Sequence, residues 1–239
     1  MSSFYLIQSG PSSKLETNFN PAIDLGPGEF EIAMHSLETY YSIPNIDARN
    51  NKIRISLDKG KSWQDLTLPI GCYDHIDISN EIQRQVVVIG GDKNDVIIKA
   101  NKNTFQSVMI LALSVVVDFT TKNSVRSILG FESKVFKSGR HVSKNTVNSM
   151  KINSILLHTD VINSAYLNGR GAPVIYSFWP SVAPGNKIVI EPKVLIYMPL
   201  SISLISHMTS WLTGQDQEEL DLRGEILTIK YHIRKCHTV

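Results

Sequence analysis

The sequence predicts an all-β sandwich in which two antiparallel sheets pack face to face. Three features support this prediction: apolar and polar residues alternate with a period of two, short Gly/Pro turns separate the alternating segments, and helical patterns are few. Because alternation places one face of a strand in a core and the other in water, its repetition is typical of antiparallel sheets. Uneven strands with long connections favour a jelly roll or a related sandwich over a meandering barrel.

Alternation is clearest near the end of the chain, in the segment EILTIKYHIR (225–234), where Leu227, Ile229, Tyr231 and Ile233 fall on one face and polar residues alternate with them. The segments GEFEIAMHS (28–36) and NKIRISLD (51–58) alternate in the same way. The continuous apolar run from Val108 to Val117 differs, and it predicts one strand covered on both faces.

Two segments predict short helices in the connections between strands. In DHIDISNEIQRQV (74–86), apolar residues recur every fourth position, and Asp74 or Asp77 is the expected N-cap. In TKNSVRSILGF (121–131), Asn123 or Ser124 is the expected N-cap and Gly130 the C-cap.

The chain shows neither a composition shift nor an internal repeat, so we expect a single domain over residues 1–239. Within it, residues 1–28 would form an N-terminal strand or arm.

The formal net charge of +2 requires no nucleic-acid partner, and none is expected. The apolar runs are too short or too interrupted to span a membrane. The first residues lack the basic region and apolar core of a signal peptide, and Cys72 and Cys236 suit free thiols, so we expect synthesis in the cytosol.

No motif in the sequence indicates catalysis. There is no H-x-H pair, no G-x-S-x-G nucleophile elbow and no Walker phosphate loop. The turn NGRG (168–171) is rich in glycine, but the strand-like residues VIYSF follow it where a phosphate loop would require a helix. We therefore predict no enzyme, and no catalytic, cofactor-binding or metal-binding residue.

Four segments together resemble a known family. They are LETYYSIPNI (37–46), VVVDFTTKNSVRSILGF (115–131), AYLNGRGAPVIYSFWPSVAPGNKIVIEPKVLIYMPL (165–200) and LDLRGEILTIKYHIR (220–234). In this order, they resemble the minor capsid protein, or penton, of Polinton/Maverick elements and adintovirus-like viruses. The resemblance spans roughly residues 29–234, which is nearly the whole chain.

This resemblance implies a single jelly roll of two four-stranded sheets, with no catalysis and no cofactor. It implies a structural virion protein that assembles as a homopentamer at icosahedral five-fold vertices and contacts the double-jelly-roll major capsid protein. Ring contacts join unlike surfaces, and such interfaces commonly use apolar and aromatic anchors. The candidate subunit-contact residues are Arg170, Tyr176, Phe178, Trp179 and Arg223. Core packing explains the three aromatic residues equally well. Arg170 could instead be a solvent-facing loop residue, and Arg223 could pair with a carboxylate of its own loop.

An alternative function is a jelly-roll recognition module that binds a glycan or a host receptor through its end loops. Sugar faces stack on aromatic rings, so Trp63, Trp179 and Trp211 are the candidates for such binding. The acidic loop at residues 214–221 is interpreted as a solvated connection and is given no role.

Overall fold

The computed structural model describes residues 3–148, 152–163 and 165–236 of the chain. These residues divide into two compact units, the first formed by Met1–Ile43 with Ile152–Val239 and the second by Pro44–Lys151. The sequence led us to expect one domain over residues 1–239, because its composition does not change at either junction. Each unit has its own hydrophobic core. Antiparallel strands predominate and helices are short, which confirms the all-β prediction.

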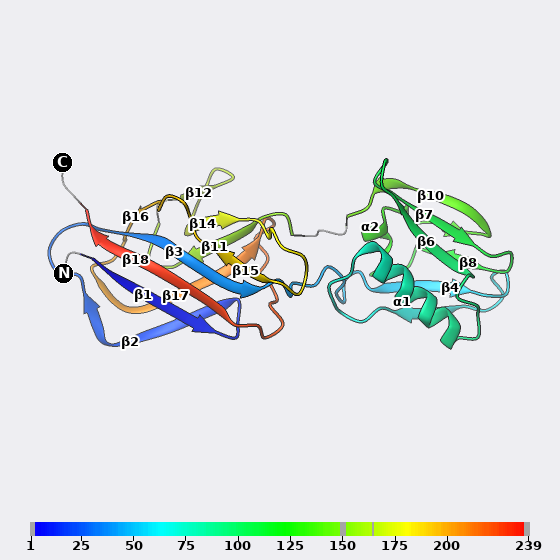
Figure 1. Cartoon of the computed structure of the whole chain (residues 1–239), viewed down its shortest axis with the longest axis horizontal. Helices are drawn as coiled ribbons and strands as arrows, with labels where there is room; N and C mark the ends of the chain where they lie inside the picture. The colour runs from blue at the N-terminus through cyan, green and yellow to red at the C-terminus, as the bar shows by residue number, and fades with distance from the viewer. Residues whose placement is uncertain (1–2, 149–151, 164, 237–239) are drawn as a thin grey trace. The chain divides into compact units, whose positions relative to one another are not determined.

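Two large antiparallel sheets form the sandwich of the first unit, which also contains a separate two-stranded hairpin (Figure 1). The first sheet has the order β1-β18-β3-β15, and the second has the order β14-β11-β17-β2. The strands of these two paths are β1 (Ser3–Gly10), β2 (Lys14–Asp24), β3 (Phe30–Tyr40), β11 (Ile155–Thr159), β14 (Val174–Phe178), β15 (Lys187–Ile190), β17 (Leu204–Gly214) and β18 (Leu227–Lys235). The short strand β16 (Met198–Pro199) also pairs with β3.

The pairing order of these strands is that of a jelly roll. Along the chain, the first strand pairs with the last, the second with the next to last, and so inward: β1 with β18, β2 with β17, β3 with β15 and β11 with β14. This nested antiparallel pairing, distributed over two sheets, is the double Greek-key arrangement that defines the fold. The jelly-roll prediction is therefore confirmed, and this fold is confined to the first unit.

The core of the first unit lies between the two sheets. In β18, the predicted inward residues Leu227, Ile229, Tyr231 and Ile233 are all 0% exposed. They belong to one cluster with residues of the opposite sheet such as Leu157. Each buried side chain of this kind contributes about 1.5–3 kcal/mol relative to an exposed one, so the alternation in the sequence explains why the sheets pack.

Residues 1–28 contribute more than the single strand or arm that the sequence suggested. This range contains two long strands, β1 and β2, and each ends a different sheet of the jelly roll. Leu6 of β1 and Leu15 of β2 are buried in the common core. The N-terminal segment is thus an integral part of the sandwich.

The second unit interrupts the jelly roll between β3 and β11. Its sheets have the orders β5-β4-β8-β9 and β10-β7-β6. Its described elements are β4 (Lys52–Ser56), β5 (Gln64–Thr67), α1 (His75–Val88), β6 (Val96–Asn101), β7 (Gln106–Leu111), β8 (Val116–Asp118), α2 (Arg126–Leu129), β9 (Val135–Phe136) and β10 (Gly139–Thr146). No helix in the described ranges is long and apolar enough to cross a membrane.

Both predicted helices are present in the second unit. Asp74 caps α1, and Asp77 completes a capping box with it. Helix α2 ends at Gly130, whose φ of 77° is in the left-handed region, as predicted for a C-cap. The N-cap position of α2 is occupied by Val125, one residue after the predicted Ser124, and Ser124 Oγ accepts a hydrogen bond from Arg126 N–H over 3.3 Å at the start of the helix.

The run from Val108 to Val117 does not form the single strand that the sequence predicted. It divides between β7 and β8, which belong to different sheets. The intervening turn is closed by a hydrogen bond from Val115 N–H to Ala112 O, and its Leu113 side chain is 87% exposed. An apolar run cannot reveal such a turn when the turn itself contains an apolar residue.

Candidate functional site

The glycine-rich turn of the first unit forms a tight β-hairpin. Strands β12 (Ala165–Leu167) and β13 (Arg170–Ala172) pair through it, with Leu167 opposite Arg170. Its two turn residues, Asn168 and Gly169, have φ values of 50° and 79°. Asn-Gly with positive φ at both positions is the combination that two-residue hairpins favour. The backbone here closes a hairpin, and Arg170 is exposed beside it.

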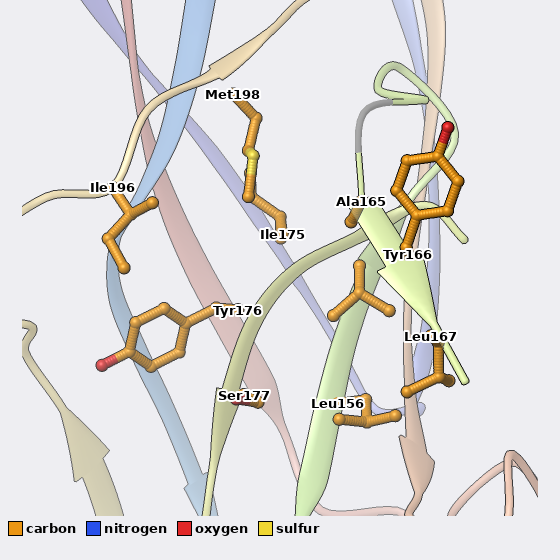
Figure 2. A pocket seen from close by; sticks show the side chains of 10 residues that line it. Leu156, Ala165, Tyr166, Leu167, Ile175, Tyr176, Ser177, Ile196 and Met198 are labelled. Carbon is orange, nitrogen blue, oxygen red and sulfur yellow. The ribbon is translucent and has the colours of Figure 1, made fainter. Parts of the chain in front are cut away.

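An apolar groove of about 460 Å³ lies beside this hairpin. Figure 2 shows Tyr176 and Ile196 on one side of the groove, and Tyr166 and Leu167 on the other. Among the described residues that line it, none is Asp, Glu, Lys, Arg or His. Its lining residues are Leu156, Ala165, Tyr166, Leu167, Val174, Ile175, Tyr176, Ser177, Ile196 and Met198. The groove is therefore suited to an uncharged, apolar occupant.

Strand β14 supplies four consecutive residues of this groove, and it is the end strand of its sheet. Strand β17 pairs with the other side of β11. There, Leu212 N–H donates to Ser13 O over 3.0 Å, so it points away from β11. Its partner Leu157 consequently directs its backbone polar groups toward Tyr176 in β14. Since these groups alternate along a strand, Ser177 directs its N–H and C=O to the open edge.

The predicted contact residues fall into different environments. Tyr176 lines the groove and is half-buried, and Trp179 is 70% exposed. Phe178 is buried in the core, which favours the packing interpretation of this residue. Arg223 is exposed, has a φ of 55°, and donates its backbone N–H to Asp221 Oδ1 over 2.7 Å. Neither Arg223 nor Trp179 lines the groove.

Sequence reasoning missed several residues of the groove. Tyr166 is 81% exposed and Ile196 is 56% exposed, although both are large and apolar. Leu156 faces the groove from β11, where every residue is buried, so no alternation marks it. One sequence feature could have indicated the groove: two apolar segments, AYL and KVLIYMPL, flank the strand VIYSF. Whether these segments lie next to that strand in space depends on the jelly-roll pairing.

Two of the three tryptophans proposed for glycan binding have partners within the fold. The Trp211 ring stacks on His158 with centroids 5.1 Å apart. Trp63 is half-buried, and the Arg54 guanidinium lies 5.4 Å from its ring centroid. Trp179 is the most exposed of the three.

One histidine–serine pair has a distance that suits a catalytic dyad. His75 Nε2 lies 3.0 Å from Ser107 Oγ, and burial lowers the pKa of His75. However, Ser107 is 0% exposed, so a substrate could not reach its hydroxyl in this conformation. Across residues 3–148, 152–163 and 165–236, no three His, Cys, Asp or Glu side chains gather in a way that could hold a metal ion.

These features define a class of protein: a jelly roll with an inserted β unit and an uncharged groove along one sheet edge. A solved structure with a similar fold is the mavirus penton protein, with a TM-score of 0.53 and 9% sequence identity. The similarity covers 98% of this chain and 100% of the penton chain. No family model and no curated protein matches the sequence. The penton resemblance expected from the sequence is thus confirmed at the level of fold.

Proposed function

We propose that this chain is a structural capsid protein of the penton type. The observation that carries this proposal is the fold shared with the mavirus penton over 98% of this chain and 100% of that one. A match confined to the jelly roll would be weak support, because jelly rolls serve many functions. Full coverage of both chains means that the similarity includes the inserted unit as well.

In this proposal, five copies form a ring at an icosahedral five-fold vertex. A ring requires two unlike surfaces on each subunit that fit each other. The first unit offers exposed apolar and aromatic residues for this purpose, including Trp179 and the groove residue Tyr166. Such side chains are enriched at protein interfaces. The ring would contact the double-jelly-roll major capsid protein in the virion.

The mass of the purified chain in solution tests this proposal. Size-exclusion chromatography with light scattering should give about five times the 26.7 kDa chain mass, alone or after addition of the major capsid protein. Negative-stain images should show five-fold rings. A monomer at every concentration, with or without that partner, would refute the proposal.

The alternative function, recognition of a glycan or host receptor, is favoured by one observation, the 70% exposure of Trp179. A glycan array with the wild-type chain and a Trp179→Ala variant tests it. Glycan binding that the variant loses would support a recognition role, which is compatible with a vertex position. Absence of binding by the wild-type chain would leave the capsid role alone.

A further inference from the structure

Four strands end the main strand paths of the two jelly-roll sheets, and they differ in charge. They are β1, β15, β14 and β2. Lys14 and Glu16 lie in β2, and Lys187 lies in β15. By contrast, β1 (SFYLIQSG) and β14 (VIYSF) contain no charged residue. Charged side chains on an end strand discourage pairing with another chain, so their absence marks β1 and β14 as edges that accept a further strand.

Along the open edge of β1, the backbone N–H and C=O groups that face outward belong to residues with exposed apolar side chains. Directly after β18, Cys236 N–H donates to Glu29 O, just before β3, over 2.8 Å and so points toward β3. Because backbone groups alternate, Ile233 points the other way and bonds to Phe4 in β1. The backbone groups of Tyr5 and Ile7 consequently face the open edge. Their side chains are 53% and 60% exposed, respectively.

The open edge of β14 lies in the apolar groove, where Ser177 directs its N–H and C=O outward. An extended segment placed there would gain backbone hydrogen bonds from the edge and apolar contacts from Tyr166 and Ile196 at the rims. The uncharged lining disfavours a charged segment, since burying a charge without a partner is costly. The groove therefore selects an uncharged, extended strand, and β1 has both properties.

We propose that β1 of one copy of this chain pairs with the open edge of β14 in the next copy and places Ile7 in the groove. The contact joins two unlike edges, so it can repeat from copy to copy and close a ring. The sheet of one subunit would then continue into the sheet of its neighbour. This inference rests on the proposed self-assembly and names the surfaces that carry it.

A matched pair of substitutions at Ser177 tests the β14 side. Proline removes the outward N–H while leaving the bonds of Tyr176 and Phe178 to β11, and proline is tolerated at strand edges of this kind. Alanine keeps that N–H and serves as the control. We expect the S177P chain to have the 26.7 kDa mass of one copy, whereas S177A assembles like the wild-type chain.

A substitution on the other surface shows whether the contact joins unlike edges. Ile7→Pro removes the outward N–H of β1, whereas the control Ile7→Val keeps both that N–H and an apolar side chain for the groove. S177P retains an intact β1 edge, and I7P retains an intact β14 edge. An equimolar mixture of the two should therefore form two-copy species, although each variant alone is monomeric. If neither variant reduces assembly, the proposed pairing is wrong.

Folding of each variant is checked by circular dichroism and thermal unfolding. If S177P fails to fold, Ser177→Lys replaces it, because a lysine keeps the N–H but introduces a charge into the groove. If the wild-type chain forms rings and S177P or S177K forms the same rings, the pairing is wrong and the proposed function stands. A wild-type chain that never assembles would overturn both.

Discussion

The hydroxyl of Tyr231 in one jelly-roll sheet donates a hydrogen bond to Ser210 Oγ in the other sheet, over 2.7 Å. Both residues are 0% exposed. Ser210 Oγ in turn donates to Gln8 Oε1 over 2.5 Å, and Gln8 Nε2 donates to Thr17 Oγ1 and to Met208 O. Every polar group in this buried hydrogen-bond network has a partner. Burial raises the pKa of Tyr231 far above its ordinary value, so its hydroxyl remains a donor.

Removal of the tyrosine hydroxyl should destabilise the jelly roll. Tyr231→Phe removes the hydrogen bond that Ser210 Oγ accepts. We expect a loss of about 1–3 kcal/mol in the free energy of unfolding. Ser210→Ala should cost more, because it leaves both Tyr231 Oη and Gln8 Oε1 without their partner. Urea unfolding of the three proteins measures this order. Equal stability of wild type and Y231F would contradict the account of the network.

Gly130 should be essential for the second unit. Its φ is 77°, and a Cβ at this position would overlap the backbone oxygen of Asn145. Gly90 has a φ of 92°, with open space around the position of a Cβ. Left-handed backbone strain of about 1–2 kcal/mol applies to an alanine at either site, but only G130A adds the overlap. G130A should therefore be the less stable variant.

Hydrogen exchange with mass spectrometry locates this effect. In G130A, faster exchange should be concentrated within residues 44–151, since Gly130 and Asn145 belong to that unit. G90A serves as the control for backbone strain alone. Equal exchange in the two variants would show that the close approach to Asn145 is unimportant.

The jelly roll should fold without the inserted unit. Its strands and its core come from residues on either side of residues 44–151, and the inserted unit has a separate core. Replacement of residues 44–151 by a flexible Gly/Ser linker should give a soluble β-rich protein with a cooperative thermal transition. A disordered product would show that the first unit depends on the insertion.

Acidification should weaken the jelly roll partly through His158. This residue is buried against Trp211, and burial lowers its pKa below the ordinary value of 6.5. The unfolded chain then binds a proton that the folded chain does not, so stability falls as pH drops below about 6.5. His158→Gln should lose less stability than wild type between about pH 7.5 and pH 5.

Urea unfolding at several pH values measures this difference. His75 and His232 also have pKa values lowered chiefly by burial, so some pH dependence should remain in the variant. An unchanged pH dependence in H158Q would contradict the role assigned to His158.

Local pattern predicted the individual elements well where one periodicity governs a segment. The alternation in EILTIKYHIR became β18, and the four-residue spacing of Ile78, Ile82 and Val86 became the buried face of α1. The same reasoning failed for the run from Val108 to Val117, where the turn carries an apolar residue. The division into two units was also invisible, because both units are β-rich and share one composition.

The groove could not be predicted without knowing how the strands pair. Leu156, Tyr166 and Ile196 are brought together by the pairing of β14 with β11 and by the hairpin next to them. Sequence reasoning found Arg170 and Tyr176 in this region, yet it also selected Phe178, whose side chain faces the core. A strand-like segment next to a turn does not reveal which of its aromatic residues points outward.

Native mass spectrometry of the purified chain shows whether it self-assembles as proposed for a penton-type capsid protein. The expected result is a dominant species of five copies, each of 26.7 kDa, that breaks down to single copies in S177P but not in S177A. A spectrum containing only the single-copy mass, at all protein concentrations and with the major capsid protein present, would contradict it.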